Sequence, residues 1–532
     1  MPQTHDKNLN SHVITGHYQG GGAKLVHIES SFTKGFAGIQ MIGNLSEVCK
    51  DGKERARSAL EKLGITLPAQ RVVLSLTPAD FKKDGNHYDL PIAVSIFKLL
   101  RPEAIKRDLS RWLFAAELGL DGRLRPVRSI SSFAIAAKAH GLEGIIAAPQ
   151  NLEQICALIK TKDCQLQVQT FHDLASLVEW INGHTETSTP PFKHPQNERA
   201  FQTNFDDMNL SNEQKKIALV CAAGGHSLFL QGPPGTGKSM FAQRIPSILP
   251  KMTQDDHITS MQIHSSMKET LSQQILAGIP PFRSPHHQAS SAAIMGTPEC
   301  PGEISLAHGG ILFLDELPEF RRDLVESLRE PLEAKCVHIS RSGRRASWPA
   351  NFILIAAANL CPCGWRNSTK RECRCPQNRI DSYRAKISGP IENRIDIHYN
   401  MPELRSSNGQ FFLDIAQNSS QTADLQERVK RARQFSAKRN QSLGCRLNSE
   451  LTSQMLVEAM GQSRLKFTNL INQVIPNYAS RRSTIRCLRI ARTLADLRQD
   501  KHVSSDDLQT SWGWQSESAA INRGEDIRSI RA

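Results

Sequence analysis

The octapeptide Gly-Pro-Pro-Gly-Thr-Gly-Lys-Ser at residues 232–239 constrains the fold of this chain more than any other feature. It fits the pattern G-x-x-x-x-G-K-[ST] and lies between a short apolar run at 227–230 and a segment of helical character. In such a loop, glycines let backbone N–H groups wrap phosphates, and the helix N-terminus adds a positive end. We expect Lys238 to reach the β- and γ-phosphates of ATP and Ser239 to bind Mg²⁺. The expected nucleotide-binding residues are Gly232, Pro233, Pro234, Gly235, Thr236, Gly237, Lys238 and Ser239. The alternative, a chance glycine-rich turn, has none of this context.

A second apolar run ends in two adjacent carboxylates. Residues 310–314 predict a buried central strand, and Asp315 and Glu316 follow it directly. Asp315 is expected to hold Mg²⁺, and Glu316 to polarise the attacking water. A doubled acid at this point favours hydrolysis over binding alone, although a solvated strand end is the simpler alternative.

Three further residues complete the expected site. The run 352–358 predicts a strand that ends at Asn359, which is placed to orient water near the γ-phosphate. Arg394 is a candidate arginine finger for a neighbouring subunit, with a surface pair to Asp396 as the alternative. Arg482 opens an arginine-rich helix and is the candidate nucleotide-sensing arginine of a C-terminal lid, in competition with Arg481 and Arg486.

Four phrases carry a resemblance to a known family: 282–287 (FRSPHH), 301–308 (PGEISLAH), 312–320 (LFLDELPEF) and 361–364 (CPCG). Together with the motifs above, they resemble the AAA+ superfamily, in the branch of magnesium-chelatase I subunits and MCM helicases. More narrowly, residues 23–510 resemble the magnesium-chelatase-like YifB/ComM family. The resemblance implies a homohexameric ring with ATP sites between subunits. Proteins of the ComM type are associated with natural transformation, in which they drive branch migration of incoming DNA.

The chain is too long for one core, and its composition divides it into segments. We expect an α/β protein with a central AAA+ core at 205–402, which includes the cysteine cluster 361–375, and a helical lid at 411–510. The N-terminal domain at 23–182 should be joined to the core by a Pro-containing linker at 183–204. A flexible leader at 1–22 and a polar tail at 511–532 complete the prediction. No apolar run approaches the ~20 residues of a membrane span, so we expect a cytoplasmic protein without membrane contact.

The N-terminal segments 77–91 and 117–127 resemble the domain that this family shares with Lon proteases, an α+β fold (S5 domain 2-like). Lon-type proteolysis needs a serine nucleophile and a lysine that activates it. By register from those segments, the serine's place holds His87 and the lysine's place holds Ser131. We therefore interpret the domain as a non-catalytic module for assembly or DNA contact.

Cysteines at 361, 363, 373 and 375 form two closely spaced pairs. Two such pairs can surround one tetrahedral zinc ion, although one intervening residue is tighter than the usual two to four. The surrounding segment is basic and has no apolar pattern, so a metal would supply order that its composition lacks. The hypothesis is a structural Zn²⁺ bound by Cys361, Cys363, Cys373 and Cys375, with free thiols or a redox pair as the alternative.

Residues 336–352 predict a β-hairpin whose tip carries Arg341, Arg344 and Arg345. These arginines could contact DNA phosphates, and a formal net charge of +14 favours a polyanionic partner. A solvated turn is the alternative. The roles of His286 and His287 stay open between a second pore element and simple packing.

These patterns together predict a hexameric ATP-driven DNA helicase that acts on single-stranded, forked or branched DNA, with recombination proteins as possible partners. Two rivals remain. One is a chelatase-type ATPase that remodels a protein partner, and the other is a DNA-binding scaffold with slow ATP turnover.

Overall fold

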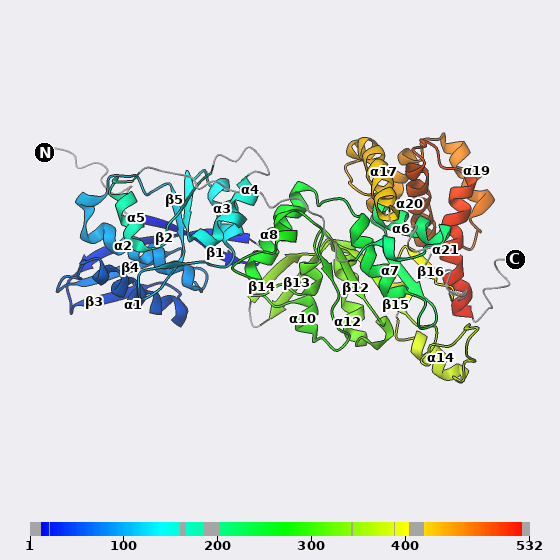
Figure 1. Ribbon diagram of the computed structural model, residues 1–532, viewed down its shortest axis with the longest axis horizontal. Helices are drawn as coiled ribbons and strands as arrows, with labels where there is room; N and C mark the ends of the chain where they lie inside the picture. Colours follow the sequence, from blue (N-terminus) through cyan, green and yellow to red (C-terminus); the bar gives the residue numbers. More distant parts are fainter. Residues whose placement is uncertain are drawn as a thin grey trace.

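The computed structural model describes residues 12–20, 22–159, 166–185, 203–341, 344–387, 389–403 and 420–523. Figure 1 shows three successive parts along the long axis: a sheet-rich N-terminal part, a central part built on a parallel sheet, and a C-terminal group of helices. Within the described residues, no helix combines the length and the apolar character that crossing a membrane requires.

A mixed seven-stranded sheet with helices on both faces forms the N-terminal part. Side chains alternate along its strands, so that Phe114 enters one apolar core while Leu113 and Ala115 enter the other. The strand order is β3 (Gly38–Ile42), β4 (Arg71–Thr77), β2 (Gly22–Thr33), β1 (His12–Gln19), β5 (Trp112–Ala115), β8 (Gly144–Ala147) and β9 (Gln167–Thr170). One core is shared with α1 (Glu47–Lys62), α2 (Asp89–Leu100) and α5 (Leu174–Ile181), and the other with α3 (Ile130–Ala139) and α4 (Leu152–Ile159).

The first strand corrects the prediction of a flexible leader up to residue 22. Residues 12–19 pair with β2 in antiparallel register, from His12 opposite Glu29 to Gln19 opposite Gly22. Gly20, one of the glycines that were expected to end the leader, instead lies in the turn between β1 and β2, with a φ of +57°. Residues 1–11 and most of the predicted linker, 186–202, lie outside the described residues.

Five parallel strands form the sheet of the central part. Their order is β11 (Phe282–Arg283), β12 (Ile311–Leu314), β15 (Ile353–Ala358), β10 (Leu228–Gln231) and β16 (Ile397–Asn400). The three strands predicted from apolar runs are thus confirmed as β10, β12 and β15. Because all five run in parallel, the polar residues that follow them meet at one edge of the sheet.

A separate two-stranded hairpin, β13 (Cys336–Arg341) and β14 (Arg344–Pro349), confirms the hairpin predicted at 336–352. Its base is anchored, because Val337 and Trp348 are fully buried and Trp348 Nε1 donates to the Thr297 carbonyl at 2.9 Å. Arg341 and Arg344 face each other across the end of the ladder.

Among the described residues, the C-terminal part contains the helices α17 (Gln421–Leu443), α18 (Ser453–Ala459), α19 (Arg464–Val474), α20 (Arg481–Leu497) and α21 (Ser505–Arg523). The last helix corrects the predicted polar tail at 511–532, because residues 511–523 are helical. Trp514 is buried in the core of the central part, and Gln515 Nε2 donates to the Asp396 carbonyl at 2.9 Å. Residues 524–532 lie beyond the described part of the chain.

Helix α8 (Gln254–Met267) belongs to the central part and contacts both other parts. Near its start, Asp256 pairs with Arg446 of the C-terminal part at 2.9 Å. Near its end, the Ser265 carbonyl accepts from the Ser129 amide of the N-terminal part at 2.7 Å. Apolar side chains seal the second contact, since Met261, Ile275 and Leu276 are buried within the core cluster that contains α3 and α4.

Candidate active site

The phosphate-binding loop follows β10 and leads into α7 (Lys238–Arg244). Gly235 and Gly237 adopt φ values of +75° and +85°, in the left-handed region that glycine reaches without strain. Thr236 Oγ1 donates to the Pro233 carbonyl at 3.0 Å and holds the loop in shape. Nothing lies within 4 Å of a Cβ placed on Gly235, so this part of the loop is open to a ligand at the start of α7.

Lys238 connects the loop to the neighbouring strand. Its Nζ donates to the carbonyls of Gly232 and Pro233, each at 2.8 Å, and to Asn359 Oδ1 at 3.1 Å. Burial lowers the pKa of Lys238 to about 8, and the nearby Asp315 and Glu316 oppose that shift. An anionic ligand would restore the preference for the charged form.

The predicted magnesium ligands are in direct contact. Ser239 Oγ donates to Asp315 Oδ2 at 2.7 Å, which joins the loop to the end of β12. A hydroxyl and a carboxylate oxygen are hard ligands of the kind Mg²⁺ takes beside phosphate oxygens, so these residues fit the ion.

Glu316, the second acid of the pair, has an exposed side chain. The residue has a φ of +52°, and its side chain is 56% exposed. Its Oε2 lies 3.8 Å from His287 Nδ1, and the His287 ring packs on His286 with centroids 4.1 Å apart. The proximity of His287 to Glu316 was missed by sequence reasoning, because it depends on β11 lying beside β12.

A cavity of about 430 Å³ lies over the loop. Besides residues 235–240 it is lined by Asp207, Met208, Asn209 and Gln214, which the sequence did not single out. Asp207 is held in place by Arg244 of α7, whose Nε lies 2.6 Å from Asp207 Oδ1. These residues belong to the segment before and at the start of α6 (Asn212–Gly224), so this segment forms one wall of the nucleotide cavity.

Arg394 and Arg482 lie together on a different surface. Arg394 Nη2 donates to Glu333 Oε1 at 2.6 Å, and Arg482 Nη2 lies 3.6 Å from the same oxygen. Both line a cavity of about 540 Å³ that also contains Lys335, Arg486 and Arg489. Neither arginine is among the residues that line the cavity over the phosphate-binding loop. Glu333, which joins the two predicted arginines, was not anticipated.

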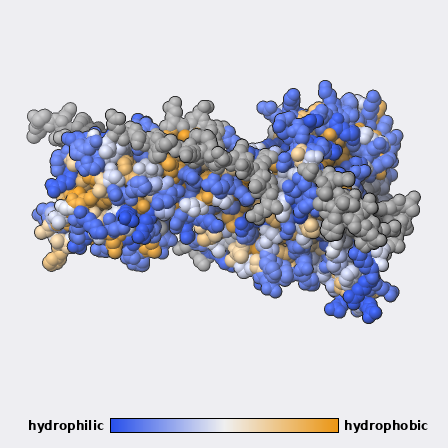
Figure 2. Space-filling model, viewed as in Figure 1, coloured by the Kyte–Doolittle hydropathy of each residue, from blue (hydrophilic) through white to orange (hydrophobic). Residues whose placement is uncertain are grey.

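The four predicted cysteines converge. The Sγ atoms of Cys361, Cys363, Cys373 and Cys375 all lie within 4.8 Å of one another. Cys361 Sγ is 3.4 Å from Cys363 Sγ and 3.6 Å from Cys373 Sγ. Four thiolates around zinc at ~2.3 Å would be separated by ~3.8 Å, so the geometry fits the metal. The cluster precedes α14 (Gln377–Arg384), which projects from the central part in Figure 1 and is hydrophilic in Figure 2.

The predicted DNA-contacting arginines are only partly described. Arg341 and Arg345 are exposed, whereas residues 342 and 343 and the side chain of Arg344 lie outside the described part. Arg345 lines a cavity between the central and N-terminal parts. The adjoining backbone is close to the N-terminal part, since a Cβ added at Gly20 would lie 3.4 Å from Ala346 Cα.

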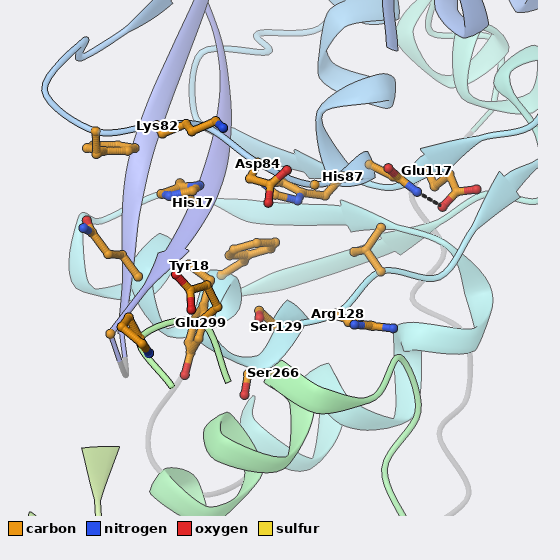
Figure 3. Close-up of a pocket in the computed structure, with 18 of the residues that line it drawn as sticks. His17, Tyr18, Lys82, Asp84, His87, Glu117, Arg128, Ser129, Ser266 and Glu299 are labelled. Atoms are coloured by element: carbon orange, nitrogen blue, oxygen red, sulfur yellow. Dashed lines mark hydrogen bonds between the residues drawn. The ribbon is translucent and has the colours of Figure 1, made fainter. Parts of the chain in front are cut away.

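That cavity, of about 990 Å³, occupies the Lon-like region (Figure 3). Figure 3 shows Lys82, Asp84 and His87 on one side and Ser129, Ser266 and Glu299 on the other. His87, at the serine's place, lines this cavity, and burial lowers its pKa to about 3. Ser131, at the lysine's place, is fully buried at the start of α3. A neutral imidazole and a buried hydroxyl thus occupy the two positions.

Proteins and family models of the magnesium chelatase type match this sequence along almost the whole chain. Family models described as magnesium chelatase subunit ChlI match residues 28–151 and 204–409, and the model of its C-terminal region matches 419–514. The uncharacterized protein YifB of Escherichia coli is 34% identical over 495 residues, which cover 92% of this chain and 94% of that protein. The competence protein ComM of Haemophilus influenzae is 32% identical over 499 residues, with the same coverage. A Lon protease of Flavobacterium johnsoniae is 26% identical over 183 residues, which cover 33% of this chain and 22% of that protein. The chain belongs to the family of magnesium-chelatase-like AAA+ ATPases that includes YifB and ComM.

Proposed function

We propose that this protein is a homohexameric, ATP-driven DNA motor that acts in the cytoplasm and moves branched recombination intermediates, as in natural transformation. The ATPase activity in this proposal rests on one observation: Ser239 Oγ donates a hydrogen bond to Asp315 Oδ2 at 2.7 Å, beside Lys238 and Asn359. The sequence relationship to a competence protein supports the DNA half.

In this proposal each residue around the loop has a separate role. Lys238 neutralises the β- and γ-phosphates, while Ser239 and Asp315 hold Mg²⁺, which supplies charge compensation for the transferred phosphoryl group. Glu316 polarises the attacking water, and its exposed side chain leaves room for that water. Asn359 positions the water near the γ-phosphate.

The position of two arginines supports the proposed ring. Arg394 and Arg482 share Glu333 and line a basic cavity separate from the cavity over their own loop. An arginine finger needs a phosphate, and a neighbouring subunit would bring one to this cavity. Glu333 holds both guanidinium groups in place until that phosphate arrives.

DNA contact is assigned to the hairpin β13–β14. In a ring, Arg341, Arg344 and Arg345 of every subunit could contact phosphates without reading sequence. The formal net charge of +14 suits a polyanion. We assign one structural Zn²⁺ to Cys361, Cys363, Cys373 and Cys375 on the basis of their Sγ separations.

A chelatase-type remodeller of a protein partner is the second candidate, because the matching family models describe magnesium chelatase subunits. One comparison separates the two. ATP hydrolysis should be measured with forked, single-stranded and duplex DNA and without DNA, beside a branch-migration assay. A DNA motor hydrolyses ATP faster with its DNA substrate and moves the junction. Equal rates in all conditions together with an immobile junction would favour the remodeller.

A further inference from the structure

The cysteine cluster lies against the phosphate-binding loop, although the two are more than a hundred residues apart in sequence. Gly364, between the cysteine pairs, has a φ of +83° and faces Pro234. A Cβ placed on Gly364 would lie 2.7 Å from Pro234 Cγ and 3.8 Å from Asn359 Cγ. The glycine therefore permits a contact too close for any larger residue.

The same segment begins at the sensor strand. Asn359, which accepts a hydrogen bond from Lys238 at 3.1 Å, is followed by Leu360 and Cys361, both buried. A displacement of Cys361 would pass to Asn359 through Leu360, the single buried residue between them.

The other end of the segment is fixed to the exit of β16. Glu403 accepts hydrogen bonds from Ser368 Oγ at 2.5 Å, from the Thr369 amide at 2.7 Å and from Thr369 Oγ1 at 2.6 Å. The chain at this exit also approaches the loop, since a Cβ on Gly232 would lie 2.7 Å from the Met401 carbonyl oxygen. Segment 361–375 thus connects the phosphate-binding loop with the point where the chain leaves the core for the C-terminal helices.

This bridge has little apolar support of its own. Cys361 is the only residue of 361–375 in the set of buried apolar side chains, and the rest is mainly polar or charged. Apolar packing alone cannot hold such a segment rigid, so its order depends on the Glu403 hydrogen bonds at one end and on the four thiolates and whatever joins them at the other.

We propose that a zinc ion held by Cys361, Cys363, Cys373 and Cys375 keeps the phosphate-binding loop in its nucleotide-binding shape, so that ATP affinity depends on the metal. The inference rests on the ATP site proposed above and assigns these cysteines a positioning role. With the four thiolates joined by the metal, Cys361 and Cys363 would hold Gly364 against Pro234 and Leu360 next to Asn359. Without the metal the segment gains conformational freedom, and nucleotide binding must then restore its order.

The test removes the metal from the full chain with a zinc-selective chelator, followed by desalting. Elemental analysis measures zinc, and titration with a fluorescent ATP analogue in the presence of Mg²⁺ measures affinity. We expect near-stoichiometric zinc in fresh protein, a rise of at least about tenfold in nucleotide Kd after its removal, and recovery with one equivalent of Zn²⁺. Circular dichroism keeps loss of fold separate from loss of affinity.

Three variants sharpen the result. Cys373→Ser should lose zinc and weaken nucleotide binding, whereas Cys300→Ser, which changes an exposed cysteine outside the cluster, should do neither. Glu403→Gln should keep zinc yet weaken nucleotide binding, because it loosens only the other end of the bridge. This variant guards against a Cys373→Ser protein that merely misfolds.

The outcomes separate the inference from the function on which it rests. Unchanged nucleotide affinity in folded, zinc-free protein would overturn the positioning role while leaving the ATPase assignment intact. Absence of zinc from fresh protein that binds nucleotide would overturn it equally. Failure of the zinc-loaded protein to bind any nucleotide would instead remove the proposed function itself.

Discussion

At the scale of single residues, Lys238 holds a charge that its surroundings disfavour. Burial lowers its pKa to about 8 in the free protein, and phosphate would raise it. Below that pH the lysine is charged before and after ATP binds. Above it, binding must also take up a proton, so affinity falls with rising pH.

We therefore expect the Kd for ATP to rise above about pH 8, by up to about tenfold per pH unit. Fluorescence titration between about pH 7 and pH 9.5 measures this, within the range where an unshifted lysine would stay charged. Lys238→Met supplies the control, because it should bind ATP weakly and lose this dependence. A flat profile for the unaltered protein would show that Lys238 stays charged in the free state.

Glu316→Gln should separate binding from turnover. The amide cannot polarise water, while Lys238 and the magnesium ligands are retained, so ATP should bind normally and hydrolysis should fall by about 10²–10⁴-fold. Glu319→Gln is the matched control, because Glu319 is an exposed acid of the same turn that pairs with Lys386 at 3.5 Å. Steady-state hydrolysis and nucleotide titration on both variants test whether Glu316 acts in turnover and not in binding. Near-normal turnover in Glu316→Gln would reassign the base.

The sequence could predict the loop, Asp315, Glu316 and Asn359 because each belongs to a local pattern of an apolar run followed by polar residues. The geometry that joins them follows from parallel strands. The sequence could not predict that His287 approaches Glu316, or that Glu333 joins Arg394 and Arg482. Those contacts depend on strand order and helix packing, which no short pattern encodes.

At the scale of elements, the hairpin β13–β14 has an anchored base and an exposed end. Val337 and Trp348 are buried at the base, whereas Arg341 and Arg345 are exposed. Replacing residues at the exposed end should therefore leave the fold intact. Arg345 also lines the cavity toward the N-terminal part, so its contribution is best separated from that of Arg341.

Alanine at Arg341, Arg344 and Arg345 together should weaken binding to every DNA sequence alike, since phosphate contacts carry no base information. The slope of log affinity against log salt should flatten by about 0.7–0.9 for each phosphate that an arginine no longer neutralises. ATP hydrolysis without DNA should persist, while stimulation by DNA and branch migration fall together. Alanine at the exposed Arg57, Arg123 and Arg125 of the N-terminal part controls for the change in net charge. An unchanged slope with normal branch migration would leave the hairpin without a role in DNA binding.

The boundaries of helices and strands were predicted least well where an element packs on a segment distant in sequence, or where the element's own sequence is polar. Residues 12–19 become a strand only beside β2 and β5, and 511–523 become helical with Trp514 against the central core. The glycines at 20–22 suggested flexibility, yet a tight hairpin turn needs the same residue type. The polar composition after Trp514 similarly concealed the continuation of helix α21 to residue 523.

At the scale of the whole molecule, the separation of Arg394 from its own phosphate-binding loop predicts complementation between subunits. Arg394→Ala and Lys238→Ala proteins should each be inactive alone, since a finger contributes about 10³-fold or more. Mixed rings should regain activity, because some interfaces then combine an intact lysine with an intact arginine. Arg482→Ala should complement Lys238→Ala in the same way, since it shares Glu333.

The matched control mixes Lys238→Ala with Glu316→Gln. Both changes fall on the same side of an interface, so no mixed ring contains a complete site, and hydrolysis should stay absent. Activity is measured across mixing ratios after the subunits have exchanged. Equal recovery in both mixtures, or recovery in neither, would contradict a finger that acts across the interface.

The contact of α8 and α9 (Gln273–Leu276) with the N-terminal part also bears on how the chain can be shortened. Met261, Ile275 and Leu276 are buried in a core cluster that they share with α3 and α4. Cutting the chain between residues 185 and 203 would leave a fragment that keeps every phosphate-binding residue and yet presents these three side chains to water. Such a fragment would self-associate through its newly exposed apolar surface, and this aggregation could be mistaken for ring formation. A soluble ATPase fragment therefore requires polar replacements at these three positions.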